Sequence, residues 1–302
     1  MTPPSGEQYE ISQGNLRAVV VEVGGGLREL TCGDWHVLDG YREDEMCSAA
    51  RGHPLIPWPN RLRDGWYRWD GEEQQVALSE PSRHNALHGL VRWSRWEPAE
   101  RARDRLVMSH RLHPQPGYPF LLDLRIEYRL AERGLTATFH AANPGVRALP
   151  LAVGVHPYVK LGEGPIDPDE LTIPARTVLQ TDERQIPTGS LPVEGTDFDF
   201  RTPRRIGGMR LDTAFADLER DSEGRATVVQ TRGERSVRLW QDERFTHVMA
   251  FTADTLPDPS QHRRSLGVEP MTCPPNSLQT GEGLIRLEPG EEWSASWGIE
   301  VS

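Results

Sequence analysis

The chain has 302 residues, with 34 Lys and Arg against 45 Asp and Glu, which gives a formal charge of −11. Nucleic acid and anionic lipid surfaces are bound by clustered cations, so this acidic balance argues against both as partners. The cysteines Cys32, Cys47 and Cys273 are odd in number and widely spaced. That pattern fits neither a disulfide framework nor a zinc site made of paired cysteines.

The amino terminus carries neither a basic segment nor an apolar segment of the kind found in secretion signals, and apolar runs such as 248–251 are too short to cross a bilayer. We therefore expect a cytoplasmic protein. No low-complexity linker or abrupt change of composition divides the sequence, and a single domain over residues 1–302 is the simplest division.

Short strands joined by turns are predicted along the whole chain. Segments 17–23 and 27–30 flank three consecutive glycines, and segments 67–69 and 75–78 flank an Asp-Gly pair typical of hairpin turns. Apolar residues then alternate with charged ones over 122–130, and the alternation resumes over 135–141 after a turn, which predicts a long antiparallel hairpin. Segment 284–287 leads through a Pro-Gly turn into a last alternating segment, 293–301.

No segment repeats apolar residues with a helical period over three turns, and Pro or Gly interrupts most stretches that are long enough for a helix. The sequence therefore predicts an all-β protein, a large antiparallel sandwich or a barrel. In such a fold the functional residues come from distant parts of the chain.

Three short segments carry polar residues that turn formation and packing explain poorly. Asn60 and Arg61 follow a Pro-Trp-Pro run, and His88 lies in an Asn-Ala-Leu-His-Gly run shortly after them. His156 is predicted at the end of a strand, beside a proline. Glu269 lies among apolar and conformationally restricted residues, and such surroundings raise the pKa of a carboxyl group toward the range useful for a general base.

Structural interpretations of the same residues remain open. Glu269 could pair with Arg263 or Arg264 in a solvated ion pair at a strand end. Arg61 could bind backbone carbonyls of its own loop. Asp212 could hydrogen-bond its own turn.

The sequence argues against a metal site and favours a sugar ligand. His84 and His88 would share a face only on a helix, and there is no His-Glu-x-x-His motif, 2-His-1-carboxylate spacing or cysteine pair. Nucleotide-binding glycine loops and the Gly-x-Ser-x-Gly motif of hydrolases are also missing. Nine Trp stand against seven Phe and six Tyr, and indoles stack on sugar rings. Trp58, in a Pro-rich loop, is the candidate for such a contact.

Five motifs, taken in order, resemble the signature of the aldose 1-epimerase (galactose mutarotase) family, and the resemblance extends from about Val19 to the Leu-x-Pro-Gly-Glu run at 287–291. They are Asn60-Arg61, Asn85-x-Leu-His88-Gly, His156-Pro-Tyr158, Leu211-Asp212-x-x-Phe215 and Val268-Glu269-Pro270. The resemblance implies a large antiparallel β-sandwich of the galactose mutarotase type, with the sugar in an open cleft and no metal or organic cofactor.

The resemblance also implies roles for single residues. Glu269 would take the proton of the C1 hydroxyl of a free hexose, and His156 would protonate the ring oxygen, with the roles exchanged on ring closure. The family's substrate-binding positions are matched by Asn60, Arg61, His88 and Asp212. The expected partner is thus a small-molecule sugar, bound by a monomer or a homodimer.

The substrate and some alternatives stay open. The run after His156 departs from the His-x-Tyr-Phe-Asn of galactose-specific members, and the runs around His88 and Glu269 resemble a bacterial branch that includes sulfoquinovose mutarotases. A related branch acts on hexose 6-phosphates, and the arginines near the candidate site in sequence are compatible with it; they are Arg51, Arg61, Arg63 and Arg92. A non-catalytic carbohydrate-binding module, and a glycoside-processing enzyme that uses Glu269 with Asp212, are the other candidates.

Overall fold

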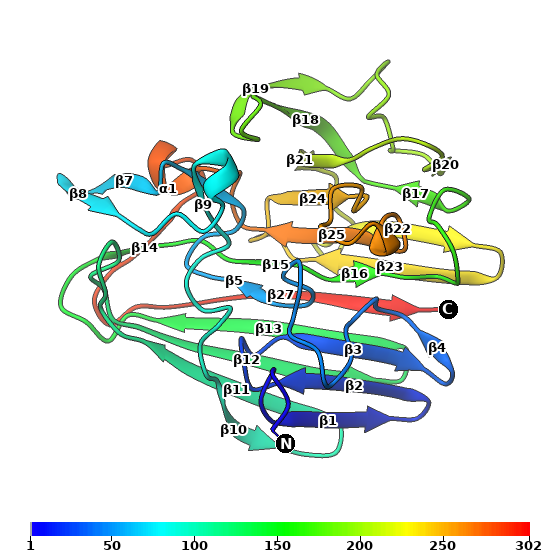
Figure 1. The fold of residues 1–302 in the computed structure, drawn as a ribbon, viewed down its shortest axis with the longest axis horizontal. Helices are drawn as coiled ribbons and strands as arrows, with labels where there is room; N and C mark the ends of the chain where they lie inside the picture. Colours follow the sequence, from blue (N-terminus) through cyan, green and yellow to red (C-terminus); the bar gives the residue numbers. More distant parts are fainter. Residues whose placement is uncertain (1) are drawn as a thin grey trace.

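The computed structural model describes residues 2–302 and consists almost entirely of antiparallel strands (Figure 1). Within that described part the helical elements are one short α-helix, α1 (Ser277–Thr280), and the 3-10 turns Pro81–Arg83 and Pro259–Gln261. The all-β prediction is therefore confirmed. No helix formed by residues 2–302 is long and apolar enough to span a membrane.

Two large sheets dominate the molecule. The nine-stranded sheet contains, in spatial order, β10 (Glu97–Arg101), β11 (Arg105–Leu112), β12 (Leu122–Ala131), β13 (Gly134–Ala142), β27 (Glu292–Val301), β23 (Arg235–Gln241), β22 (Ala226–Arg232), β17 (Glu170–Thr172) and β20 (Arg204–Arg205). The eight-stranded sheet contains β19 (Pro187–Pro192), β18 (Ala175–Thr181), β21 (Asp212–Leu218), β24 (His247–Phe251), β25 (Leu266–Met271), β15 (Gly154–Val155) and β5 (Pro54–Leu55), and β16 (Tyr158–Val159) also pairs with β25.

Smaller sheets complete the fold. A four-stranded sheet contains β1 (Gln8–Gln13), β2 (Leu16–Val21), β3 (Leu27–Cys32) and β4 (Trp35–His36). Three two-stranded pairs are β14 (Leu149–Leu151) with β26 (Ile285–Leu287), β6 (Arg61–Arg63) with β9 (Asn85–Leu87), and β7 (Trp66–Trp69) with β8 (Glu72–Gln75). The β7–β8 hairpin, β9 and α1 gather at one end of the molecule, at the upper left of Figure 1.

The core follows from the alternation in β12, β13 and β27. Ile126 lies opposite Phe139, which in turn lies opposite Ala295, and all three side chains are buried. The same cluster of buried apolar side chains includes Val248 of β24 and Val268 of β25. Since one continuous core draws on both large sheets, the arrangement is a sandwich.

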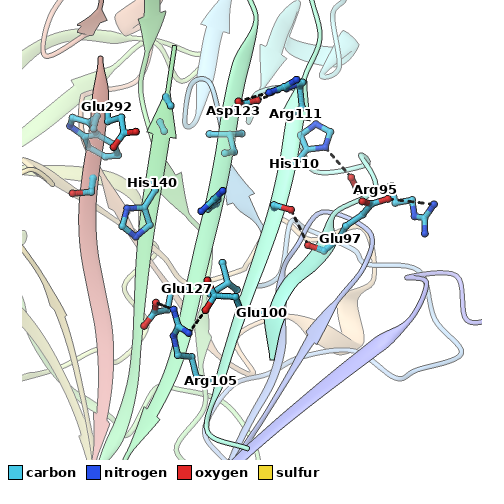
Figure 2. A pocket seen from close by; sticks show the side chains of 18 of the residues that line it. Arg95, Glu97, Glu100, Arg105, His110, Arg111, Asp123, Glu127, His140 and Glu292 are labelled. Carbon is cyan, nitrogen blue, oxygen red and sulfur yellow. Dashed lines mark hydrogen bonds and ion pairs between the residues drawn. The ribbon is translucent and has the colours of Figure 1, made fainter. Parts of the chain in front are cut away.

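The opposite face of the nine-stranded sheet is polar and hollowed (Figure 2). The hollow has a volume of about 990 Å³. Ion pairs cross it: the guanidinium of Arg105 lies 2.8 Å from Glu127, and that of Arg111 lies 2.6 Å from Asp123. None of the residues that the sequence singled out for a site lines this hollow. Its charges largely neutralise one another, as expected of a solvated sheet face.

One strand prediction was shifted. The hairpin around Asp70-Gly71 exists, but its second strand is β8 at 72–75 rather than 75–78. Trp69 lies directly opposite Glu72, so the two-residue turn leaves no room for a later start. The charged and polar composition of β8 hid this strand from the apolar pattern.

Candidate active site

His156 lies immediately after β15, a very short strand held between two others. Gly154 of β15 pairs with Met271 of β25 on one side and with Leu55 of β5 on the other. A Cβ atom at position 154 would lie 2.7 Å from the Cβ of Pro59, so only glycine fits this close approach. The prediction that His156 emerges from a strand end is confirmed, and its position is fixed by β25.

Glu269 lies in the middle of β25, opposite Met249 of β24, and its side chain is only 3% exposed. Its Oε1 lies 3.1 Å from Nε2 of His156. The remaining polar atoms of the pair, Glu269 Oε2 and His156 Nδ1, are buried and have no hydrogen-bond partner among residues 2–302. Buried polar atoms are normally satisfied, so these two are available to a ligand.

Burial acts on both members of this pair in the same sense. It raises the pKa of Glu269 well above its usual value, and the nearby charge of Asp212 raises that pKa further. It lowers the pKa of His156, and the positive charges of Arg51 and Arg92 add to this effect. Both shifts disfavour the charged forms, so the pair holds one proton that either group can carry at little extra cost.

His88 reaches the same place from β9 and its following turn. Asn60 and His88 both adopt left-handed backbone conformations, with φ of 55° and 62°. The two residues bind each other twice, because Asn60 N–H donates to His88 Nδ1 at 3.2 Å and His88 N–H donates to the Asn60 carbonyl at 2.9 Å. Non-glycine residues in this conformation are uncommon and concentrate at functional sites.

The contact between Asn60 and His88 also fixes a tautomer. Because His88 Nδ1 accepts a hydrogen bond, the proton of the neutral ring resides on Nε2. Burial lowers the pKa of His88 well below its usual value, and the charges of Arg92 and His156 act in the same direction. His88 is therefore a neutral hydrogen-bond donor rather than a cation.

Arg61 and Asp212 complete the polar wall. Arg61 Nε donates to Glu80 at 2.9 Å, and its Nη2 lies 3.8 Å from Asp212 Oδ2. Burial raises the pKa of Asp212, whereas the charge of Arg61 lowers it. Glu80, which the sequence did not single out, also accepts from Asn85 Nδ2 at 3.0 Å. No motif marks it, because its role depends on a partner 19 residues away.

A stack of planar groups supports His156. Its ring lies parallel to that of Tyr158, with centroids 4.8 Å apart and an interplanar angle of 8°. The guanidinium of Arg51 lies 4.6 Å from the centroid of the Tyr158 ring. Arg51 is in turn held by Asp39, whose Oδ2 lies 3.5 Å from Nη2. The His-Pro-Tyr motif contained Tyr158, but nothing in the sequence indicated that Arg51 lies against it.

Some predictions for single residues were wrong. Trp58 is only 2% exposed and packs in a small core with Leu62 and Tyr67, so the structure does not support stacking on a sugar. Asp212 begins a strand rather than a turn, as β21 shows. Arg61 uses carboxylates rather than loop carbonyls.

The pairing of Glu269 with Arg263 or Arg264 is also excluded. Arg263 binds Asp167 at 2.6 Å and Asp254 at 3.0 Å, and Arg264 binds Asp39 at 3.0 Å. Both arginines therefore have carboxylate partners of their own. Glu269 instead faces histidine, as a catalytic interpretation requires.

The argument from spacing against a metal site does not hold in three dimensions. His88, His156 and Glu269 bring ligand atoms within 4.8 Å of one another, a 2-His-1-carboxylate set that a divalent ion could use. The three residues are far apart in the sequence, so no local motif could show them. The direct hydrogen bond between Glu269 and His156 occupies one ligand position on each, and proton transfer between them needs no ion.

Comparisons with known proteins agree with this architecture. The Escherichia coli (strain K12) protein YihR is 34% identical over 288 residues, which cover 95% of this chain and 91% of YihR. Galactose mutarotase of Sus scrofa is 34% identical over 227 residues, 68% of this chain and 64% of that protein.

Solved structures show the same fold. A GalM/aldose epimerase homologue from C. elegans has a TM-score of 0.88 at 18% identity and covers 98% of both chains. Galactose 1-epimerase from Lactobacillus acidophilus NCFM has a TM-score of 0.81 at 18% identity, covering 98% of this chain and 94% of its own. The family description "Aldose 1-epimerase" matches residues 7–300. The chain therefore belongs to the aldose 1-epimerase family.

Proposed function

We propose that this protein interconverts the α and β anomers of a free hexose, with Glu269 and His156 as its acid and base. The observation that carries the proposal is the buried contact of 3.1 Å between Glu269 Oε1 and His156 Nε2, with one further unsatisfied atom on each residue. An anomer exchange needs one group that accepts a proton and one that donates a proton, and this pair supplies both.

Each step conserves the single proton of the pair. The Glu269 carboxylate takes the proton of the C1 hydroxyl, while protonated His156 gives its proton to the ring oxygen. The bond between C1 and the ring oxygen breaks, and C1 becomes an aldehyde carbon. Both residues are then neutral, the state that their burial favours. Rotation about C1–C2 and the reverse transfers close the ring on the other face.

The remaining polar groups hold and polarise the sugar. Neutral His88 offers an N–H donor, Arg61 offers a guanidinium, and Asp212 and Asn60 offer acceptors for hydroxyl groups. Donors fixed in place before the reaction stabilise the charge that develops on the ring oxygen without reorganisation. No step requires a metal ion or an organic cofactor.

The first experiment measures anomer exchange at equilibrium by magnetisation-transfer NMR, with glucose and galactose as substrates. Glu269→Gln and His156→Asn should each reduce kcat by about 10²–10⁴-fold, because neither amide can transfer the proton. Glu288→Gln, an equivalent change at an exposed position, should leave the rate within twofold of the wild type, on the order of experimental scatter.

The alternatives give different results. A folded wild-type protein that broadens sugar resonances but does not accelerate exchange would be a carbohydrate-binding module. Release of sugar from an aryl glycoside, with no exchange of free hexose, would instead indicate glycoside processing by Glu269 and Asp212. Full exchange activity in both active-site variants would contradict the proposed roles.

A further inference from the structure

Arg92 carries a guanidinium without a counter-charge. No carboxylate lies within ion-pair distance of it in the part of the chain that the structure describes, residues 2–302. Its Nε is buried without a hydrogen-bond partner, and its one hydrogen bond is a long contact of 3.5 Å from Nη2 to the Leu87 carbonyl. A buried cation is costly unless a partner compensates for the lost solvation.

Two other buried arginines near the site show the usual arrangement. Arg61 pairs with Glu80, and Arg51 pairs with Asp39. These two guanidinium groups hold the protein together and have little charge to offer a ligand. Arg92 differs from both, since its charge is not neutralised by the protein around it.

The position of Arg92 relates this charge to the catalytic pair. The residue whose carbonyl it contacts, Leu87, directly precedes His88. The guanidinium lies near enough to both imidazoles that its charge lowers the pKa of His88 and of His156. Next to it, His53 has both ring nitrogens buried without hydrogen-bond partners within the described residues. Its ring centroid lies 6.0 Å from that of Trp93.

The chemistry of a pyranose indicates which part of a substrate would meet Arg92. The ring oxygen is bonded to C1 and to C5, and C5 carries C6. A sugar whose ring oxygen contacts His156 therefore has its C6 substituent within two bonds of that contact. A guanidinium near His156 and His88 is placed for a group on C6.

We propose that Arg92 forms a subsite for an anionic group on C6 of the hexose, a phosphate, sulfonate or carboxylate, and that this subsite selects charged over neutral sugars. The inference rests on the proposed function, because it uses the contact of His156 with the ring oxygen. Guanidinium groups bind such oxyanions through two parallel N–H donors. The ligand would supply the negative charge that the protein withholds from Arg92.

The test compares four sugars by the same exchange measurement: glucose, glucose 6-phosphate, 6-deoxy-6-sulfoglucose and glucuronate. For the wild type, kcat/KM for at least one anionic sugar should exceed that for glucose by tenfold or more, on the order expected when a charged group loses its only partner. In Arg92→Gln this ratio should fall at least tenfold. In Arg92→Lys it should fall less, because the charge remains but the planar fork is lost.

Arg95→Gln is the matched control. It removes the same charge three residues away, but Arg95 is 73% exposed and pairs with Glu22. Its charge is screened by solvent, so the ratio should not change. The identity of the preferred anionic sugar distinguishes phosphate, sulfonate and carboxylate.

Failure of this inference differs from failure of the proposed function. Equal kcat/KM for all four sugars, or an Arg92→Gln ratio equal to that of the wild type, overturns the subsite while leaving the epimerase intact. Absence of exchange on every sugar overturns the proposed function. In that case calorimetry with glucose 6-phosphate decides: binding at least tenfold weaker in Arg92→Gln supports the subsite, and equal binding rejects it.

Discussion

Glu269 and His156 show how burial alone can prepare two ordinary side chains for proton transfer. In water the carboxylate and the neutral imidazole would keep their usual forms, with the pair well separated in proton affinity. Burial raises the pKa of Glu269 and lowers that of His156, which brings the two proton positions closer in energy. A proton that moves easily between Oε1 and Nε2 suits a reaction that must run in both directions at similar rates.

Arg51 should tune this pair through Tyr158. Its positive charge lowers the pKa of His156, and its guanidinium lies against the ring on which His156 stacks. Arg51→Met removes the charge and should make each protonation of the pair easier. Both limbs of the pH profile of kcat/KM should therefore move to higher pH. Asp39 remains bound to Arg264 in this variant, so no carboxylate is left without a partner.

The comparison with Arg51→Lys separates charge from packing. The lysine variant keeps the charge and should keep the pH profile near that of the wild type, even where kcat falls. A profile that stays in place in Arg51→Met, or that moves equally in both variants, would show that Arg51 supports only the shape of the loop. The measurement is kcat/KM for glucose from pH 5 to 9 by magnetisation transfer.

At the scale of strands, alternation was sufficient to predict the central hairpin. Polar and apolar residues alternate in β12 and β13, and the observed register places Ile126 opposite Phe139. Very short strands such as β5 and β15 have no pattern to detect, because two residues cannot alternate. They exist because β25 provides hydrogen-bond partners, which is information from a distant segment.

The candidate site shows the same division. Ordered motifs singled out the catalytic pair together with Asn60, Arg61, His88 and Asp212, which the structure places around one buried cluster. The sequence could not show that Glu80 binds Arg61 or that Arg92 lacks a partner, since both facts depend on contacts between separate strands and loops. Trp58 was mistaken because a Pro-rich loop was assumed to be exposed, and its indole is buried instead.

The hairpin offers a direct test of the core. Phe139 of β13 is 1% exposed, and Phe139→Ala should lower the free energy of unfolding by about 3–5 kcal/mol, because it leaves a cavity between the sheets. His140 is its neighbour on the same strand but lines the polar hollow of Figure 2. His140→Ala should change stability by less than about 0.5 kcal/mol. Urea unfolding measures both, and equal losses would contradict the assignment of the two faces.

Across the whole molecule, uncharged histidines are buried in both the site and the framework around it. His53 is 1% exposed, and burial, followed by the charge of Arg92, lowers its pKa to about 3. Burial also lowers the pKa of His247 on β24 to about 4. Both residues gain a proton readily once the chain unfolds, since an exposed histidine titrates near pH 6.5. The native state refuses that proton.

These two histidines should make stability depend on pH. Below about pH 6.5 the unfolded state binds more protons than the native state, so the free energy of unfolding falls as the pH falls. Each buried histidine contributes up to about 1.4 kcal/mol per pH unit, and this contribution ends near its folded pKa. His53→Leu and His247→Leu should each reduce the slope by one proton between pH 6 and 5, whatever the substitution does to stability at pH 7. Urea unfolding at a series of pH values measures the slope, and an unchanged slope in His53→Leu would mean that His53 titrates in the folded protein as it does in water.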